Sequence, residues 1–148
     1  MRLHARLAAF TLTLVAGSAL LAGCATSVSL DEPIESRTWR LTSLGLQPVR
    51  PGPAGVDLQR DPQVQFEGSR VTGSGGCNRI TGSYQRTGHD LKIGPLAATR
   101  MACVEADRGV LETGFLGALQ ATTSYALVGS QLTLLDAGGR TLAVLESR

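Results

Sequence analysis

Histidine, aromatic residues and closely spaced cysteines are scarce in this chain of 148 residues, and their scarcity limits its chemistry. It has two histidines, three cysteines and 4% aromatic residues. Structural zinc sites need four Cys or His ligands at close spacing, and no C-x-x-C pair is present. No G-x-S-x-G motif or paired-carboxylate arrangement suggests a catalytic centre either. We therefore expect no metal, no cofactor and no catalytic residues.

A surplus of positive charge is also missing from most of the chain. The 14 Lys and Arg residues exceed the 12 Asp and Glu residues by two. Arg2 and Arg6 account for that excess, since all of the acids follow residue 23. Binding to the phosphate backbone of nucleic acids depends on a basic surface. We therefore do not expect nucleic acid as a partner.

The N-terminal segment has the composition of an export signal. Two arginines precede a run of apolar and small residues over 7–23, which fits the basic and apolar regions of a signal peptide. Residues 20–24 read LLAGC and resemble the lipobox of bacterial lipoproteins, in which cleavage precedes the cysteine. An uncleaved membrane anchor is the alternative, although a span needs about 20 apolar residues. We expect a signal over 1–23 and acyl chains such as palmitate on Cys24.

Lipid on Cys24 would make the membrane a partner of the protein. Each buried methylene contributes about 0.8 kcal/mol, and stable anchoring needs more than one acyl chain. Residue 25 is Ala rather than the Asp that favours inner-membrane retention in the common Gram-negative sorting pattern. The expected location is the bacterial cell envelope, on the outer membrane and facing the periplasm.

The rest of the chain is long enough for one domain. We expect residues 24–36 to be a tether and residues 37–148 to be the domain. Apolar residues alternate with polar ones in several short stretches, which is typical of strands. Turn residues separate the stretches at 68–69, 87–90, 129–130 and 136–139, which predicts antiparallel hairpins.

Helical periodicity occurs in one region, residues 107–122. Its predicted apolar face carries Val110, Leu111, Phe115, Ala118, Leu119 and Thr122, and Asp107 is the expected N-cap. The predicted fold class is α+β and mainly β. We expect an antiparallel sheet curled into a partial barrel, with one amphipathic helix packed on it.

Cys77 and Cys103 remain after Cys24 is assigned to lipid. In an oxidising compartment such a pair favours a disulfide. Two separate buried thiols are the alternative, because cysteine is often buried. A catalytic Cys77 thiol is a weaker alternative, since His89 lies in a predicted hairpin turn and not near Cys77 in the sequence.

Two sequence blocks around these cysteines carry a family resemblance. Residues 73–84 read GSGGCNRITGSY, and residues 93–103 read IGPLAATRMAC. Both resemble blocks of the META domain family, which includes HslJ-like heat-shock lipoproteins. The resemblance extends over about residues 37–146. It implies a small β-rich domain with one helix, an envelope location, and a part in heat shock or novobiocin tolerance. The family supplies no catalytic residues to transfer.

Within these blocks, Asn78, Arg79 and Arg100 are the candidate structural residues. Asn tolerates turn conformations and bonds to nearby backbone, and Arg offers a planar fork of donors. Arg79 and Arg100 are either exposed or bonded to loop carbonyls. A sharper hypothesis has Arg100 partly buried and ordering the loop that leads to Cys103.

Two classes of function stay open. We favour a non-enzymatic envelope module that binds a protein, a lipid or a small apolar ligand. The family resemblance implies a fold like that of the pilot lipoproteins of secretion systems, which bind lipid, so this class includes a pilot-like lipoprotein. The alternative is a hydrolase that uses Cys77 or a serine together with His89. A disulfide at Cys77 with an exposed His89 would speak against the enzyme. A deep apolar pocket would favour ligand binding, and a filled core would favour a partner bound at the surface.

Overall fold

The computed structural model describes residues 33–50 and 61–147, so the predicted signal, Cys24 and most of the predicted tether lie outside the described residues. Within these ranges the elements are, in chain order, β1 (Thr38–Leu44), β2 (Gln47–Pro48), β3 (Gln63–Glu67), β4 (Arg70–Ser74), β5 (Arg79–Thr87), β6 (Asp90–Ile93), β7 (Ala97–Ala98), α1 (Ala106–Ala121), β8 (Ser124–Val128), β9 (Gln131–Leu135) and β10 (Thr141–Ser147).

Alternation of apolar and polar residues produces the strands. In β3, Val64 and Phe66 are fully buried while Gln65 and Glu67 are exposed, as the period of two in an extended chain requires. The predicted turns join β3 to β4, β5 to β6, β8 to β9 and β9 to β10, and each joins an antiparallel pair. Gly88 has a φ of 56°, a conformation that glycine adopts without steric cost.

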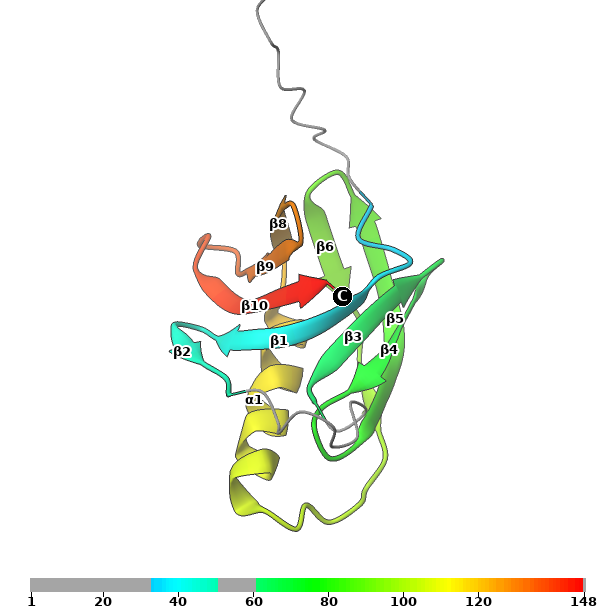
Figure 1. Cartoon of the computed structure of the whole chain (residues 1–148). Coiled ribbons are helices and arrows are strands. Elements are labelled where there is room, and N and C mark those ends of the chain that lie inside the picture. Colours follow the sequence, from blue (N-terminus) through cyan, green and yellow to red (C-terminus); the bar gives the residue numbers. More distant parts are fainter. Residues whose placement is uncertain (1–32, 51–60, 148) are drawn as a thin grey trace, which may run out of the picture.

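The sheet closes completely, which goes further than the predicted partial barrel. The barrel strands follow the order β10, β9, β8, β6, β5, β4, β3, β1, and β1 pairs with β10 to complete the circle. Figure 1 shows β1 and β10 side by side across the front of the barrel. The first and last strands of the domain therefore protect each other's edges. The β6–β8 pairing is short and has a single register pair, Asp90 with Ser124.

Helix α1 packs on the barrel, and its register corrects two predictions. Glu105, not Asp107, is the N-cap residue, and Asp107 lies in the first turn, where a negative charge suits the helix dipole. Val110 is 74% exposed, although we expected it on the apolar face. It precedes Phe115 by five residues, a rotation of about 140° around the helix axis. Glu112 is buried in its place.

Side chains fill the interior of the barrel. Most of its fully buried residues come from the strands and from α1, and the largest of these include Trp39, Phe66 and Phe115. A barrel of eight strands is just wide enough for side chains to fill it or to hold one small ligand. Here the apolar side chains of sheet and helix form one continuous cluster.

The packed domain begins before Arg37, so the predicted tether boundary is too late. Ile34 is fully buried, and its carbonyl accepts a hydrogen bond of 2.7 Å from the Trp39 indole nitrogen. Glu35 also contacts barrel residues.

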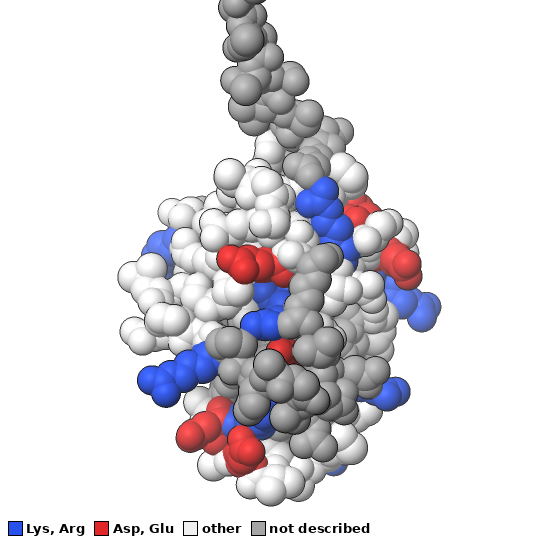
Figure 2. Space-filling view, viewed as in Figure 1, with Lys and Arg blue, Asp and Glu red and all other residues white. Residues whose placement is uncertain are grey.

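Among the described residues, no helix is long and apolar enough to span a membrane. Figure 2 shows basic and acidic side chains interspersed on the visible face.

Candidate functional site

The two cysteine blocks meet at the start of β5, where the structure joins Cys77 and Cys103 in a disulfide. Cys77 lies in the loop between β4 and β5, and Cys103 lies just before α1. Their Cα atoms are 5.6 Å apart, and 26 residues separate them in the sequence. The bond therefore ties the β4–β5 loop to the segment that enters the helix.

A buried carboxylate lies beside this disulfide. Glu112 of α1 accepts hydrogen bonds from the backbone N–H groups of Cys77 at 3.0 Å and Asn78 at 2.7 Å. Its other oxygen accepts a bond of 2.7 Å from the Asn78 side-chain amide. No cation is paired with Glu112 among the described ion pairs. The carboxylate is thus held by amide donors alone.

These donors decide the ionisation of Glu112. Burial by itself raises the pKa of Glu112, but the hydrogen bonds from Asn78 and Cys77 outweigh burial and leave its pKa below the ordinary value of 4.5. Donors directed at the ionised form favour that form. Glu112 is therefore a carboxylate at neutral pH, and it acts as an acceptor that organises the β4–β5 loop.

Asn78 links the same loop to the second cysteine block. Its side-chain oxygen accepts bonds from the Thr99 hydroxyl at 2.9 Å and from the Met101 backbone N–H at 2.7 Å. The Thr99 hydroxyl also accepts a bond from the Arg79 backbone N–H at 3.1 Å. We call Glu112, Asn78, Cys77, Thr99 and Met101 the amide cluster. Together with the disulfide, it holds both cysteine blocks and α1 in one arrangement.

The space around Glu112 explains a glycine of the motif. A Cβ atom on Gly75 would lie 2.6 Å from the Glu112 Cγ atom and 2.6 Å from its Oε2 atom. Real Cβ atoms do not approach neighbours so closely, so any larger residue must displace the glutamate. Gly75 is therefore needed here for the close approach of helix and loop.

A shallow groove of about 340 Å³ runs beside the disulfide. Its lining combines the β4–β5 loop, including Gly76 and Cys77, with Arg79 at the start of β5, residues 101–105 and Arg108. Arg79 is exposed and lines the groove. Arg100 is exposed as well, so the hypothesis in which it is partly buried is wrong.

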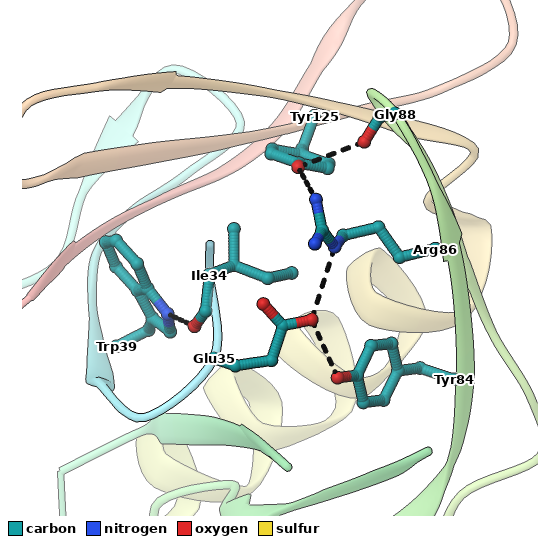
Figure 3. A network of polar contacts seen from close by, with 7 residues as sticks. All are labelled: Ile34, Glu35, Trp39, Tyr84, Arg86, Gly88 and Tyr125. Atoms are coloured by element: carbon teal, nitrogen blue, oxygen red, sulfur yellow. Dashed lines mark hydrogen bonds and ion pairs between the residues drawn. The ribbon is translucent and has the colours of Figure 1, made fainter. Parts of the chain in front are cut away.

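A second polar cluster lies near the other end of β5 (Figure 3). The Glu35 carboxylate accepts a bond of 3.0 Å from the Tyr84 hydroxyl and forms an ion pair of 3.2 Å with Arg86. Arg86 also donates to the Tyr125 hydroxyl at 3.1 Å, and that hydroxyl donates to the Gly88 carbonyl at 3.1 Å. We call Glu35, Tyr84, Arg86 and Tyr125 the ion-pair cluster. It fastens the entering chain to β5 and β8.

The ion-pair cluster shifts the titration of one tyrosine. Burial, followed by the hydrogen bond to Glu35 and the charge of Glu35, raises the pKa of Tyr84 to about 12, although Arg86 acts in the opposite direction. The phenol is therefore neutral over the physiological range. It serves as a donor to Glu35 and not as a proton-transfer group.

The residues considered for catalysis do not come together. The Cys77 sulfur is bonded to Cys103, whereas His89 is exposed in the β5–β6 turn and lies near Tyr125. These two residues are thus at opposite ends of β5. Among residues 33–50 and 61–147, no group of three or more His, Cys, Asp or Glu side chains could hold a metal ion.

Sequence reasoning missed Glu112 and Glu35. Glu112 precedes Phe115 by three residues and Leu119 by seven, so the helical period places an acid within the buried stripe. An acid at such a position signals a buried acceptor, and this signal was available in the sequence. Glu35 gives no comparable signal, because its partners lie 49 and 51 residues away.

Known proteins are similar to this chain in sequence and in fold. The chain is 27% identical over 126 residues to heat shock protein HslJ of Escherichia coli (strain K12), a match that covers 83% of this chain and 86% of HslJ. A protein from Burkholderia xenovorans, solved by NMR, superposes with a TM-score of 0.59 at 26% identity, over 78% of this chain and 83% of that one. A further NMR structure has a TM-score of 0.58 at 24% identity, over 76% of this chain and 90% of that one, and shows the shared fold.

The family assignment agrees with the two cysteine blocks and with the barrel. The META domain matches residues 32–148, a range that begins close to Ile34, where the packed structure begins. It includes both cysteine blocks, the helix and every barrel strand. The chain therefore belongs to the META domain family.

Proposed function

We propose that this protein is a non-enzymatic lipoprotein of the bacterial envelope that acts in stress tolerance by binding a partner at its outer surface. Membership of the META domain family and the similarity to a heat shock protein support the part in stress. The LLAGC stretch ending at Cys24 supports the lipid anchor. Acyl chains on that cysteine would hold the barrel at the outer membrane, facing the periplasm.

The packed interior is the observation that carries the binding mode. Apolar side chains from the strands and from α1 fill the barrel as one cluster. A lipid or small apolar ligand inside it would have to displace residues such as Trp39 and Phe115, which are fully buried. Replacing such packing is costly, because cores are close-packed. This favours a partner bound outside the barrel over a lipid carried within it, as in the pilot-like alternative.

The hydrolase alternative has less support. It requires a free Cys77 thiol or an activated serine near His89, and a nucleophile must lie within hydrogen-bond reach of its base. With the Cys77 sulfur in a disulfide and His89 at the far end of β5, the thiol version lacks both requirements. We therefore retain the binding module as the proposed function.

Complementation with defined variants tests this function. A strain lacking the gene is given wild-type protein, Cys24→Ser or His89→Ala, and survival after heat shock is measured together with incorporation of an alkyne-tagged palmitate. Wild type and His89→Ala should both be labelled and protective. Cys24→Ser should lose the label, the membrane fractionation and most of the protection. Labelled wild-type protein that gives no protection would contradict the stress role, and loss of protection in His89→Ala would favour the enzyme.

A further inference from the structure

The groove beside the disulfide has exposed apolar side chains in its lining. Its apolar lining consists of the disulfide itself, Met101, Ala102 and Val104. Met101 is 64% exposed and Val104 is fully exposed. Large apolar side chains that project next to a hollow are a common sign of a binding surface. At about 340 Å³ the groove lies near the lower limit of ligand sites, which range from about 300 to 1,000 Å³.

The charges that line the groove leave one cation without a counter-charge. Arg108 and Glu105 neutralise each other through an ion pair of 2.9 Å. The third charged residue of the lining is Arg79. Within the described part of the chain, its guanidinium makes no hydrogen bond or ion pair. An available planar fork of donors next to apolar side chains suits a carboxylate flanked by apolar groups.

The groove is also held in shape before any partner arrives. Asn78 binds the Met101 backbone through both of its side-chain polar atoms, with distances of 2.7 and 3.3 Å. The disulfide fixes Cys103, and Glu112 fixes the loop that carries Cys77. A preorganised surface loses less conformational entropy on binding. The amide cluster therefore has a use beyond stability, because it keeps Met101 and Arg79 in the lining of one groove.

From these observations we propose that the groove binds an extended segment of another protein in which an acidic residue is flanked by apolar residues. The carboxylate would pair with Arg79, and the flanking side chains would cover Met101, Val104 and the disulfide. This inference rests on the proposed function and names the class of partner. An acyl chain fits the groove less well, because the hollow is open and small. A hydrocarbon also has no negative group that could pair with the Arg79 guanidinium.

Binding of defined peptides tests the proposal. The full chain in dilute non-ionic detergent is passed over three immobilised pentapeptide mixtures. Each mixture is blocked at both ends and has Leu, Ile, Val or Phe at the outer positions. The central residue is Asp, Asn or Lys. The Asp mixture should bind best, and Arg79→Glu should weaken its binding about tenfold or more, since a charged hydrogen bond contributes about 1.5–3 kcal/mol. The same variant should gain affinity for the Lys mixture.

Two further variants separate charge from apolar contact. Met101→Glu should weaken binding of the Asp and Asn mixtures by placing a negative charge in the apolar part of the groove. Arg70→Glu is the matched control, because Arg70 is an exposed arginine on β4 that does not line the groove. It should leave the preference for Asp unchanged. Equal binding of the Asp and Asn mixtures, or equal losses in Arg79→Glu and Arg70→Glu, would overturn the proposal.

The heat-shock assay distinguishes failure of this inference from failure of the proposed function. If Arg79→Glu and Met101→Glu protect cells as well as the wild type, the groove is not the binding surface, although the stress role stands. If the wild type itself gives no protection, the proposed function fails whatever the peptides show. Loss of protection in both groove variants but not in Arg70→Glu would support the two proposals together.

Discussion

Glu112 and Glu35 are both withdrawn from solvent near the two ends of β5, but the protein stabilises their charges in different ways. Glu112 is buried and accepts bonds only from amide groups, two of them backbone N–H groups. The Glu35 side chain is 26% exposed and pairs with the Arg86 guanidinium and the Tyr84 hydroxyl. The amide cluster orders loops around the cysteines, whereas the ion-pair cluster closes the chain entry.

This difference separates a rigid end of the barrel from an adjustable one. Backbone amides fixed by a disulfide and a helix cannot move away if the carboxylate is lost, so they would remain buried without an acceptor. The Arg86 and Glu35 side chains keep partial access to water, at 21% and 26% exposed, so water can solvate either charge if its partner is removed, and the pair contributes less. Variants at the two ends should therefore differ in how much stability they lose. They should also differ in whether the pH dependence changes in acid or in alkali.

Removing the disulfide should have the largest effect on the rigid end. For a pair separated by 26 residues, the chain-entropy estimate is about 3–4 kcal/mol. We expect Cys77→Ser/Cys103→Ser to lower the free energy of unfolding by that amount in urea titrations. Wild type in reductant should approach the variant. Equal unfolding midpoints for wild type and variant without reductant would contradict the disulfide.

Replacing Glu112 by Gln should cause the next largest loss of unfolding free energy. The substitution keeps the volume but directs an amide group at amide donors, and leaving buried donors without an acceptor costs about 1–3 kcal/mol. Glu105→Gln is the control on the same helix, because that side chain is 68% exposed, and it should change stability by at most about 0.5 kcal/mol. Similar losses in the two variants would mean that the amide cluster does not depend on the carboxylate.

The lowered pKa of Glu112 also predicts how the wild type responds to acid. Because its pKa in the folded state lies below 4.5, Glu112 contributes stability above that pH and loses the contribution as the pH falls through the folded value. Glu112→Gln should remove this part of the acid dependence. Unfolding free energies measured from neutral pH downward would show it, and parallel curves for wild type and variant would exclude it.

Two glycine substitutions should change the stability of the protein in opposite directions. Gly75→Ala introduces a Cβ atom 2.6 Å from Glu112, and such overpacking costs about 1–3 kcal/mol. Gly117→Ala adds a methyl group in α1 where nothing lies within 4 Å, so its higher helix propensity should stabilise the protein by up to about 1 kcal/mol. Thermal unfolding of both variants measures this. A neutral Gly75→Ala would show that Glu112 can move without cost.

Tyr84→Phe should have the smallest effect at neutral pH and act mainly in alkali. The lost hydrogen bond to Glu35 is partly exposed and contributes about 0.5–1.5 kcal/mol. Since the pKa of Tyr84 is raised from 10.0 to about 12, its contribution is complete below pH 10 and disappears as the pH rises through the folded value. Wild type should therefore lose stability in that range, and Tyr84→Phe should lose less. Identical alkaline profiles would rule out this coupling.

Local sequence patterns were enough to predict the hairpin turns, the alternation in the longer strands, and the helix to within one residue at each end, but not the two-residue strands β2 and β7. These features depend on alternation, turn residues and helical spacing, which neighbouring residues already contain. Pairing of β1 with β10 was not predictable in this way, because Trp39 and its partner Ser147 are far apart in the chain. Sequence separation also hid the contacts of Glu35 with Tyr84 and Arg86, which lie 49 and 51 residues away, so the start of the domain was placed too late.

The sequence by itself determined the cysteine blocks, the mainly β fold and the LLAGC stretch before the domain, because short-range periodicity and composition express them directly. Only the tertiary structure decided that the barrel closes, that Glu112 accepts bonds from the Cys77 and Asn78 amides, and that Arg79, Met101 and Val104 line one groove. These arrangements depend on which distant segments share a burial site, and a buried charge such as that of Glu112 is tolerated only where the folded chain supplies its donors.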